Sequence, residues 1–175
     1  MKKIIAFGAS SSKTSINKQL ATYTANQFQN VSVEILDLND YEMPIFSVDK
    51  EKENGIPQLA HEFYTKLGSA DLIIISFAEH NGAYSAAFKN IFDWASRING
   101  KTFQEKPMLL LATSPGARGG SSVLEIATKR FPFQGGIIKG SFSLPSFNDN
   151  FDTDKGITNE ELKNVLLEIV NSIEL

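Results

Sequence analysis

The sequence predicts a doubly wound α/β fold, with a five-stranded parallel sheet in strand order 2-1-3-4-5 and helices on both faces. Two observations lead to this prediction. Short apolar runs alternate five times with longer amphipathic segments along the 175 residues, a pattern typical of an α/β protein with a parallel sheet. Three of these runs are apolar without interruption, as in strands that are covered on both faces.

The five predicted strands follow the apolar runs. They are Lys3–Phe7, Val31–Leu36, Asp71–Phe77, Met108–Thr113 and Gly135–Ser141. In the second strand, apolar and polar residues alternate, which places it nearer an edge of the sheet.

The predicted helices lie between these strands and after the last one. They are Ser15–Gln29, Pro57–Leu67, Ser85–Arg97, Ser121–Phe131 and Glu160–Ile173. Apolar residues recur at helical spacing in the third and fifth, so each has one apolar face. Because crossovers between parallel strands are right-handed, the topology narrows to a doubly wound sheet of the flavodoxin-like type.

Two polar stretches do not fit the alternation. Residues 39–55 form an excursion after the second strand, and residues 143–156 precede the last helix. Loops of this length are uncommon and often belong to sites or interfaces.

Length and composition limit the class of protein. We expect one domain over residues 1–175, because single domains commonly run to about 150–200 residues. Hydrophobic residues make up 42% and charged residues 21% of the chain, which predicts a packed core. The net charge is −3 and no block of Lys or Arg stands out, so we expect neither nucleic acid nor a membrane as partner. The chain has no cysteine and no apolar run near the ~20 residues of a membrane span, and we expect a cytoplasmic protein.

Three loops should carry the function. In an open α/β sheet, ligands bind outside the carboxyl ends of the strands, where the strand order reverses. The loops at that point are GASSSKTSIN (residues 8–17), AEHNGAYS (78–85) and SPGARGGSS (114–122). All three are rich in small residues, which permits close approach of a ligand to the backbone.

The first loop has two readings. It precedes a helix, whose first amides and dipole favour an anion, and Ser10, Ser12, Ser15 and Asn17 add donors. Alternatively, Thr14 or Ser15 only caps the helix. A nucleoside-triphosphate P-loop is disfavoured, because Lys13 comes one residue too early and the glycine before it is replaced by Ser12. A dinucleotide G-x-G-x-x-G motif is absent from this turn.

A family resemblance rests mainly on the second loop and the helix after it. Residues 78–97, AEHNGAYSAAFKNIFDWASR, resemble the segment P-E-Y-N-x-S-x-P-G-x-L-K-N-x-I-D-W-x-S-R of the NAD(P)H-dependent FMN reductases. The matching positions are Glu79, Asn81, Lys89, Asn90, Asp93, Trp94, Ser96 and Arg97. The first loop is similar to the family's G-S-x-R-x-x-S-x-N, with Ser12 in place of Arg, and SPGARGG is similar to its S-x-G-x-x-G-G loop.

The resemblance implies a flavodoxin-like FMN oxidoreductase. It would pass a hydride from NADPH or NADH through bound FMN to a small acceptor such as a flavin, a quinone, an azo compound or a metal oxyanion. The flavin carries that chemistry, so no catalytic acid, base or nucleophile and no metal are expected. The implied FMN-binding residues are Ser10, Ser12, Ser15, Ile16, Asn17, Glu79, His80, Asn81, Gly82, Ser114, Pro115, Gly116, Gly119 and Gly120. The resemblance also implies a homodimer or homotetramer.

Helix residues outside the loops are expected to have structural rather than functional roles. Asp93 and Arg97 stand four residues apart, as an ion pair along one helix would. Phe92 and Trp94 are expected in the core or at an interface, and His61 at the surface. Two other functions stay open: a flavodoxin-like electron carrier, and an FMN-binding module without NAD(P)H turnover.

Overall fold

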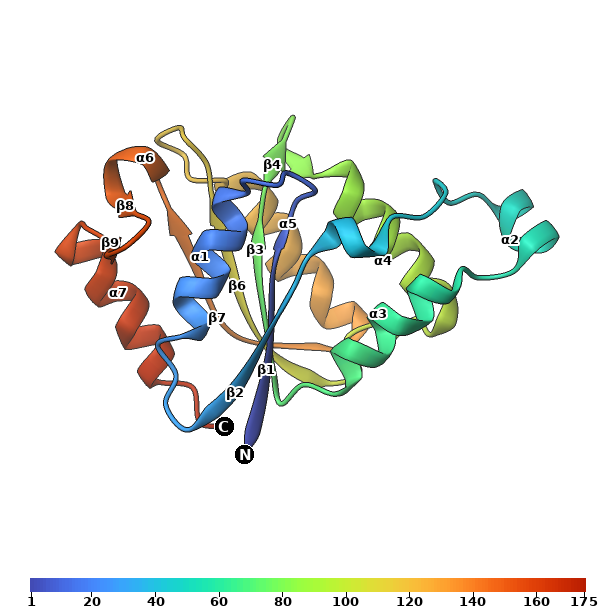
Figure 1. Ribbon diagram of the computed structural model, residues 1–175, viewed down its shortest axis with the longest axis horizontal. Coiled ribbons are helices and arrows are strands. Elements are labelled where there is room, and N and C mark those ends of the chain that lie inside the picture. The colour runs from blue at the N-terminus through green and yellow to red at the C-terminus, as the bar shows by residue number, and fades with distance from the viewer.

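A computed structural model describes all residues 1–175 and has a central five-stranded parallel sheet with helices on both faces (Figure 1). Its strand order is β2-β1-β3-β6-β7. The strands are β1 (Lys2–Ala9), β2 (Val31–Leu36), β3 (Leu72–Phe77), β6 (Lys106–Thr113) and β7 (Gly136–Leu144). Numbered among these five strands alone, the order is 2-1-3-4-5, which confirms the predicted fold class and places β2 at an edge.

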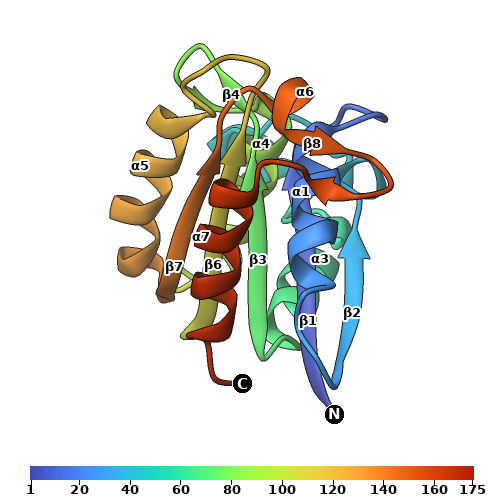
Figure 2. The same ribbon diagram turned by 90° about the vertical axis from the view of Figure 1, so that its left-hand side faces the viewer.

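The helices cover the two faces in separate groups. The face formed by α1 (Ile16–Ala25) and α7 (Glu160–Asn171) packs on one core cluster. The opposite face packs on the other cluster and is formed by α3 (Gln58–Gly68), α4 (Ala86–Ile98) and α5 (Ser121–Arg130). Figure 2 shows the sheet between these two groups.

Strand β1 shows why the apolar runs are continuous. Ile5 and Phe7 belong to the core cluster on the α3–α5 face, whereas Ile4 and Ala6 belong to the cluster on the α1–α7 face. All four side chains are fully buried. A strand that alternates between two covered faces needs an apolar side chain at every position.

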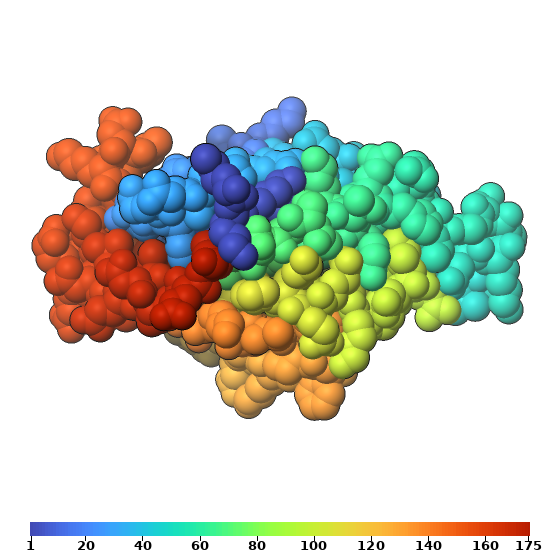
Figure 3. Space-filling model, turned by 90° about the horizontal axis from the view of Figure 1, so that it is seen from below, coloured from blue at the N-terminus to red at the C-terminus, as the bar shows by residue number.

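The excursion after β2 is more ordered than its polar sequence indicates. It contains the 3₁₀ turn η1 (Leu38–Tyr41) and the helix α2 (Val48–Asn54), which has no buried residue. Figures 1 and 3 show α2 projecting from one end of the molecule. Its base is fixed where the Trp94 indole Nε1 donates to the Pro44 carbonyl at 2.7 Å.

The Asp93–Arg97 ion pair expected along α4 is not formed. Asp93 instead accepts from Lys89 at 2.7 Å, and Arg97 pairs with Glu51 of α2 at 3.0 Å. The nearby Trp94 is buried, as expected. The prediction considered only one helix and could not include α2 as a competing partner.

Short elements fill the remaining loops. The stretch before α7 contains a helical turn and a small hairpin, named α6 (Phe147–Asn150), β8 (Phe151–Asp152) and β9 (Gly156–Ile157). Another hairpin follows β3, made of β4 (Glu79–His80) and β5 (Ala83–Tyr84). The 3₁₀ turn η2 (Phe131–Gln134) joins α5 to β7. None of the helices is both long and apolar enough to cross a bilayer.

Candidate functional site

The three loops meet around one cavity at the carboxyl edge of the sheet. We call it the three-loop cavity; it lies beyond the ends of β1, β3 and β6 and has a volume of about 240 Å³. It is lined by Ser10, Ser12, Thr14, Ser15, Ile16, Asn17, Ala78, Glu79, His80, Thr113, Ser114 and Pro115. The structure therefore brings together most of the implied FMN-binding residues, and adds Ala78, Thr113 and Thr14, of which the sequence singled out only Thr14, as a candidate helix cap.

Five of the implied residues do not line this cavity. They are Asn81, Gly82, Gly116, Gly119 and Gly120. Asn81 and Gly82 form the tight turn between β4 and β5, with φ of 53° and 78°. An Asn-Gly pair is the usual choice for such a turn, because both residues tolerate a positive φ. The composition of residues 78–85 predicts only a loop, and the Asn-Gly pair is the signal that indicates the hairpin.

The first loop presents donors at the start of α1. The Ser15 hydroxyl accepts from the Lys18 amide at 3.1 Å and so caps the helix, while the Ser12 amide donates to the Ser10 hydroxyl at 3.1 Å. Both hydroxyls keep a hydrogen to donate. The amides of Ile16 and Asn17 open the helix and have no intrahelical acceptor. Capping and anion binding are thus compatible in this loop, because each uses different atoms.

The Asn17 side chain is buried and joins the start of α1 to the ends of two strands. Its Oδ1 accepts from the Ser76 hydroxyl at 2.7 Å and from the Thr113 amide at 3.1 Å, and its Nδ2 donates to the Thr113 carbonyl at 3.1 Å. Ser76 lies in β3 and Thr113 ends β6. The side chain therefore holds the first loop in place relative to the other two strands.

Glu79 connects the second loop to the third. Its Oε2 accepts from the Val123 amide at 3.0 Å, in the first turn of α5. The carboxylate therefore caps α5 from outside, at the helix end where negative charge is favourable. Ser85 makes a similar link by capping α4 and donating to the Ala9 carbonyl at 2.8 Å.

The third loop rests on the end of β7. The Ser146 amide donates to the Gly116 carbonyl at 3.0 Å, and the Phe147 amide to the Ser114 carbonyl at 3.0 Å. Gly119 has a φ of 58°, and a Cβ there would lie 2.4 Å from the Ser143 hydroxyl. The composition of the loop predicts a glycine here for the close approach of a ligand, and close packing against β7 also requires one.

The three-loop cavity carries little charge. Glu79 is the only Asp or Glu in its lining, and no Lys or Arg contributes. Lys13, which follows Ser12, lines a neighbouring groove instead. Any anion in the cavity is therefore met by hydroxyls, amides and the dipole of α1.

The model of the NADPH-dependent FMN reductase family matches residues 2–149. The chain belongs to this family. It is thus an NAD(P)H-dependent oxidoreductase of the FMN reductase type, with FMN as its cofactor and NAD(P)H as co-substrate. A pure electron carrier or a binding module without turnover does not agree with this membership.

Relatives of this FMN reductase cover most of its length. It is 33% identical over 152 residues to an uncharacterized protein of Mycoplasma pneumoniae, the MG342 homolog, covering 84% of this chain and 89% of that one. It is 29% identical to an NADPH:quinone oxidoreductase of Arabidopsis thaliana, covering 95% and 89%. In structure it is similar to the flavoenzyme FerB of Paracoccus denitrificans, an NAD(P)H:(acceptor) oxidoreductase, with a TM-score of 0.78, 21% identity and coverage of 98% and 94%.

The three-loop cavity fits the phosphate end of FMN. The unpaired amides of Ile16 and Asn17 and the hydroxyls of Ser10, Ser12 and Ser15 face a common space at a helix N-terminus. This donor set is suited to a phosphate monoester.

Proposed function

We propose that this FMN reductase reduces quinones with NAD(P)H. The observation that carries the proposal is the convergence of the three loops on one cavity at the point where the strand order reverses. The choice of acceptor draws on the similarity, over nearly the whole chain, to the Arabidopsis thaliana NADPH:quinone oxidoreductase.

Residues of the three loops would bind different parts of FMN. Ser10, Ser12 and Ser15 donate to the phosphate, together with the amides at the start of α1. His80 and Ser114 lie on the other two loops and would border the ring and the ribityl chain.

Bound FMN supplies hydride transfer from NAD(P)H and on to the acceptor. The chain orients the flavin and keeps its loops fixed through the contacts of Asn17 and Glu79. The proposed mechanism needs no nucleophile–base pair in the protein, because the flavin carries the chemistry.

Reconstitution tests the function directly. Purified protein incubated with FMN and desalted should keep a flavin absorbance band that NADPH bleaches under anaerobic conditions. Addition of a benzoquinone should restore the band and sustain NADPH oxidation faster than an azo dye does at equal concentration. A protein that neither retains FMN nor oxidises NADPH would contradict the function, and a preference for the azo dye would contradict the acceptor.

A cation placed in the cavity tests the phosphate site. Replacing Ser12 with Arg should lower the Kd for FMN by about tenfold and make it rise with salt, because a charge-assisted bond to phosphate is worth about 1.5–3 kcal/mol. The matched control is Ser11→Arg, because Ser11 lines a different pocket on the other side of the same loop. Flavin fluorescence quenching measures both. Equal effects of the two variants would place the phosphate elsewhere.

A further inference from the structure

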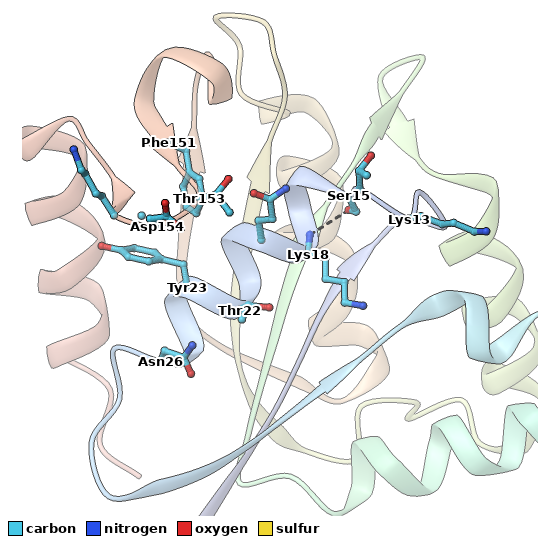
Figure 4. Close-up of a pocket in the computed structure, with 13 residues that line it drawn as sticks. Lys13, Ser15, Lys18, Thr22, Tyr23, Asn26, Phe151, Thr153 and Asp154 are labelled. Carbon is cyan, nitrogen blue, oxygen red and sulfur yellow. Dashed lines mark hydrogen bonds between the residues drawn. The ribbon is translucent and has the colours of Figure 1, made fainter.

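A second hollow adjoins the three-loop cavity. It runs between α1 and the β8–β9 hairpin and has a volume of about 500 Å³ (Figure 4); we call it the α1–hairpin groove. The groove and the three-loop cavity share Thr14 and Ser15. A group attached to a phosphate at the start of α1 would therefore enter this groove directly.

One wall is a stripe of uncharged polar side chains on α1. Ser15, Gln19, Thr22 and Asn26 recur at i, i+4, i+7 and i+11 and all line the groove, so they lie on one side of the helix. The side chains of Gln19, Thr22 and Asn26 form no hydrogen bond within the protein. By contrast, other side chains in and next to α1, such as those of Asn17 and Lys18, do form hydrogen bonds within the protein. These amides and hydroxyls are free to bind a ligand rich in donors and acceptors.

The β8–β9 hairpin forms the opposite wall and packs closely against Tyr23 of α1. The Tyr23 ring meets the Phe151 ring edge-on, with centroids 5.7 Å apart. A Cβ at Gly156 would lie 2.0 Å from the same tyrosine ring, so this position admits no side chain. The hairpin turn is fixed because Asp152 accepts from the amides of Asp154 and Lys155 at 3.0 and 2.9 Å. The groove is thus a shaped space with an aromatic side.

The charges are placed toward the ends. Figure 4 shows Asp154 at the hairpin end and Lys13 at the opposite end, in the first loop, with its side chain directed away from Thr22 and Asn26. Lys13 and Lys155 make no ion pair, whereas Lys18 is held by Asp37. Lys155 stands beside Asp154 at the hairpin end, whereas the dipole of α1 adds to Lys13 at the first-loop end. An anionic group is therefore favoured at the first-loop end, and a neutral, polar and aromatic group along the rest of the groove.

We propose that the α1–hairpin groove binds an adenosine 5′-phosphate group. The phosphate lies near Lys13 and Thr14, and the nucleoside lies along the α1 stripe beside Tyr23. The volume is within the ~300–1,000 Å³ typical of small-ligand sites. Two molecules that contain this group are compatible with the proposed function: NAD(P)H, which is the co-substrate, and FAD, a flavin that contains FMN. The inference rests on the proposed FMN site, because the groove is continuous with the cavity that would hold the FMN phosphate. If FAD binds, its FMN half would occupy the three-loop cavity and its adenylate half would occupy the groove.

A bulky side chain in the groove separates the sources. Thr22→Trp fills the middle of the stripe, and Thr65→Trp is its control, because Thr65 is an exposed threonine on α3 at the opposite face of the sheet. We expect Thr22→Trp to raise the Kd for FAD at least tenfold and the Kd for FMN less than twofold. Should the group belong to NAD(P)H, the KM for NADPH of the FMN-loaded enzyme rises about tenfold instead, and the Kd for FAD does not change. Thr65→Trp should change none of these.

The proposal is overturned if Thr22→Trp leaves both the Kd for FAD and the KM for NADPH unchanged, or if it changes FMN and FAD binding equally. Asn26→Trp, at an exposed position one turn further along, replaces Thr22→Trp if the latter does not fold. If the wild-type protein binds no FMN, the proposed function fails separately, and calorimetric titration with 5′-AMP decides the groove. AMP binding that is lost in Thr22→Trp and kept in Thr65→Trp supports the groove, and no difference between them refutes it.

Discussion

Asn17 shows how a single residue fixes the geometry of the site. Its amide is buried and bonds with Ser76 and with both backbone groups of Thr113. A site built from three loops requires that the loops keep their relative positions, and this side chain connects the first loop to β3 and β6, the strands that bear the other two. The Asn17 side chain therefore affects cofactor binding largely by holding the loops in position.

Replacing Asn17 with Ala should lower the free energy of unfolding by about 2–4 kcal/mol, because it leaves buried partners without a hydrogen bond. Urea unfolding measures the loss. Asn171→Ala, at an exposed position at the end of α7, should change stability by less than about 0.5 kcal/mol. If the two variants were equally stable, the Asn17 network would contribute nothing.

Tyr84 is a half-buried tyrosine whose hydroxyl oxygen is buried and has no partner. Its ring packs against Phe77 and Phe88 with centroids 5.7 and 5.3 Å away, and its hydroxyl oxygen lacks a hydrogen bond. Burial raises the pKa of Tyr84 from 10 to about 12. The neutral phenol is thus favoured in the folded protein.

Tyr84→Phe tests this assignment through pH. Between pH 10 and 12 the unfolded chain loses its phenolic proton before the folded one does, so the contribution of Tyr84 is complete below pH 10 and is lost as pH rises through 12. We expect the wild type to lose more stability than Tyr84→Phe between pH 8 and 11 in urea unfolding. At pH 8 the variant should be as stable as the wild type or more stable by up to about 1 kcal/mol. A clear loss at pH 8 would mean that the hydroxyl has a partner.

At the scale of elements, the contact between β1 and α1 positions the start of the helix. Gly8 lies where the helix passes over the strand, and a Cβ there would lie 2.4 Å from the backbone nitrogen of Lys18. Backbone atoms cannot move aside as a flexible side chain can. The glycine is therefore needed for close packing of these two elements.

Gly8→Ala should displace the start of α1, lower the free energy of unfolding by about 1–3 kcal/mol and weaken FMN binding at the same time. Gly100→Ala is the control, because no atom lies within 4 Å of its added Cβ. Urea unfolding and flavin fluorescence quenching provide the two readouts. Unchanged FMN affinity in a destabilised Gly8→Ala would argue against a phosphate site at the start of α1.

For the whole molecule, the sheet could be predicted from the sequence because each buried position of its central strands needs an apolar or small side chain. In β3, every side chain is buried, and the apolar run ends where the strand does. The small elements have no comparable apolar pattern in the sequence. No residue of α2 is buried, so no apolar face marks it, and β4 and β8 have two residues each, too few to show alternation.

The site was predictable to a similar degree. Its three loops follow from strand order and composition, and Ser15 could be identified as a helix cap. The Glu79 contact with the first turn of α5 joins positions 44 residues apart, and the Gly119 contact with Ser143 joins two different βα units. Such contacts depend on how the elements pack, which local patterns do not encode.

The charge pattern of the whole molecule sets its behaviour in acid. Glu34 on the edge strand β2 bonds with Lys3 of β1 at 2.8 Å and with Lys66 of α3. Hydrogen bonds from Lys3 and then Lys66 lower the pKa of Glu34, and a hydrogen bond from Lys18 lowers the pKa of Asp37. These pairs fasten three elements to the same edge of the sheet.

A lowered pKa in the folded state means that the unfolded chain takes up the proton first as pH falls. The stabilisation by Glu34 is therefore present above its ordinary value of 4.5 and is lost as pH falls through the lowered folded pKa. Glu34→Gln should lower stability at pH 7 and reduce the loss between pH 5 and 3, measured by urea unfolding at each pH. Glu161→Gln, at an exposed position in α7 without an ion pair, should leave the wild-type pH profile unchanged. If both variants kept that profile, the acid sensitivity would have to come from other carboxylates, with Asp37 the next to replace.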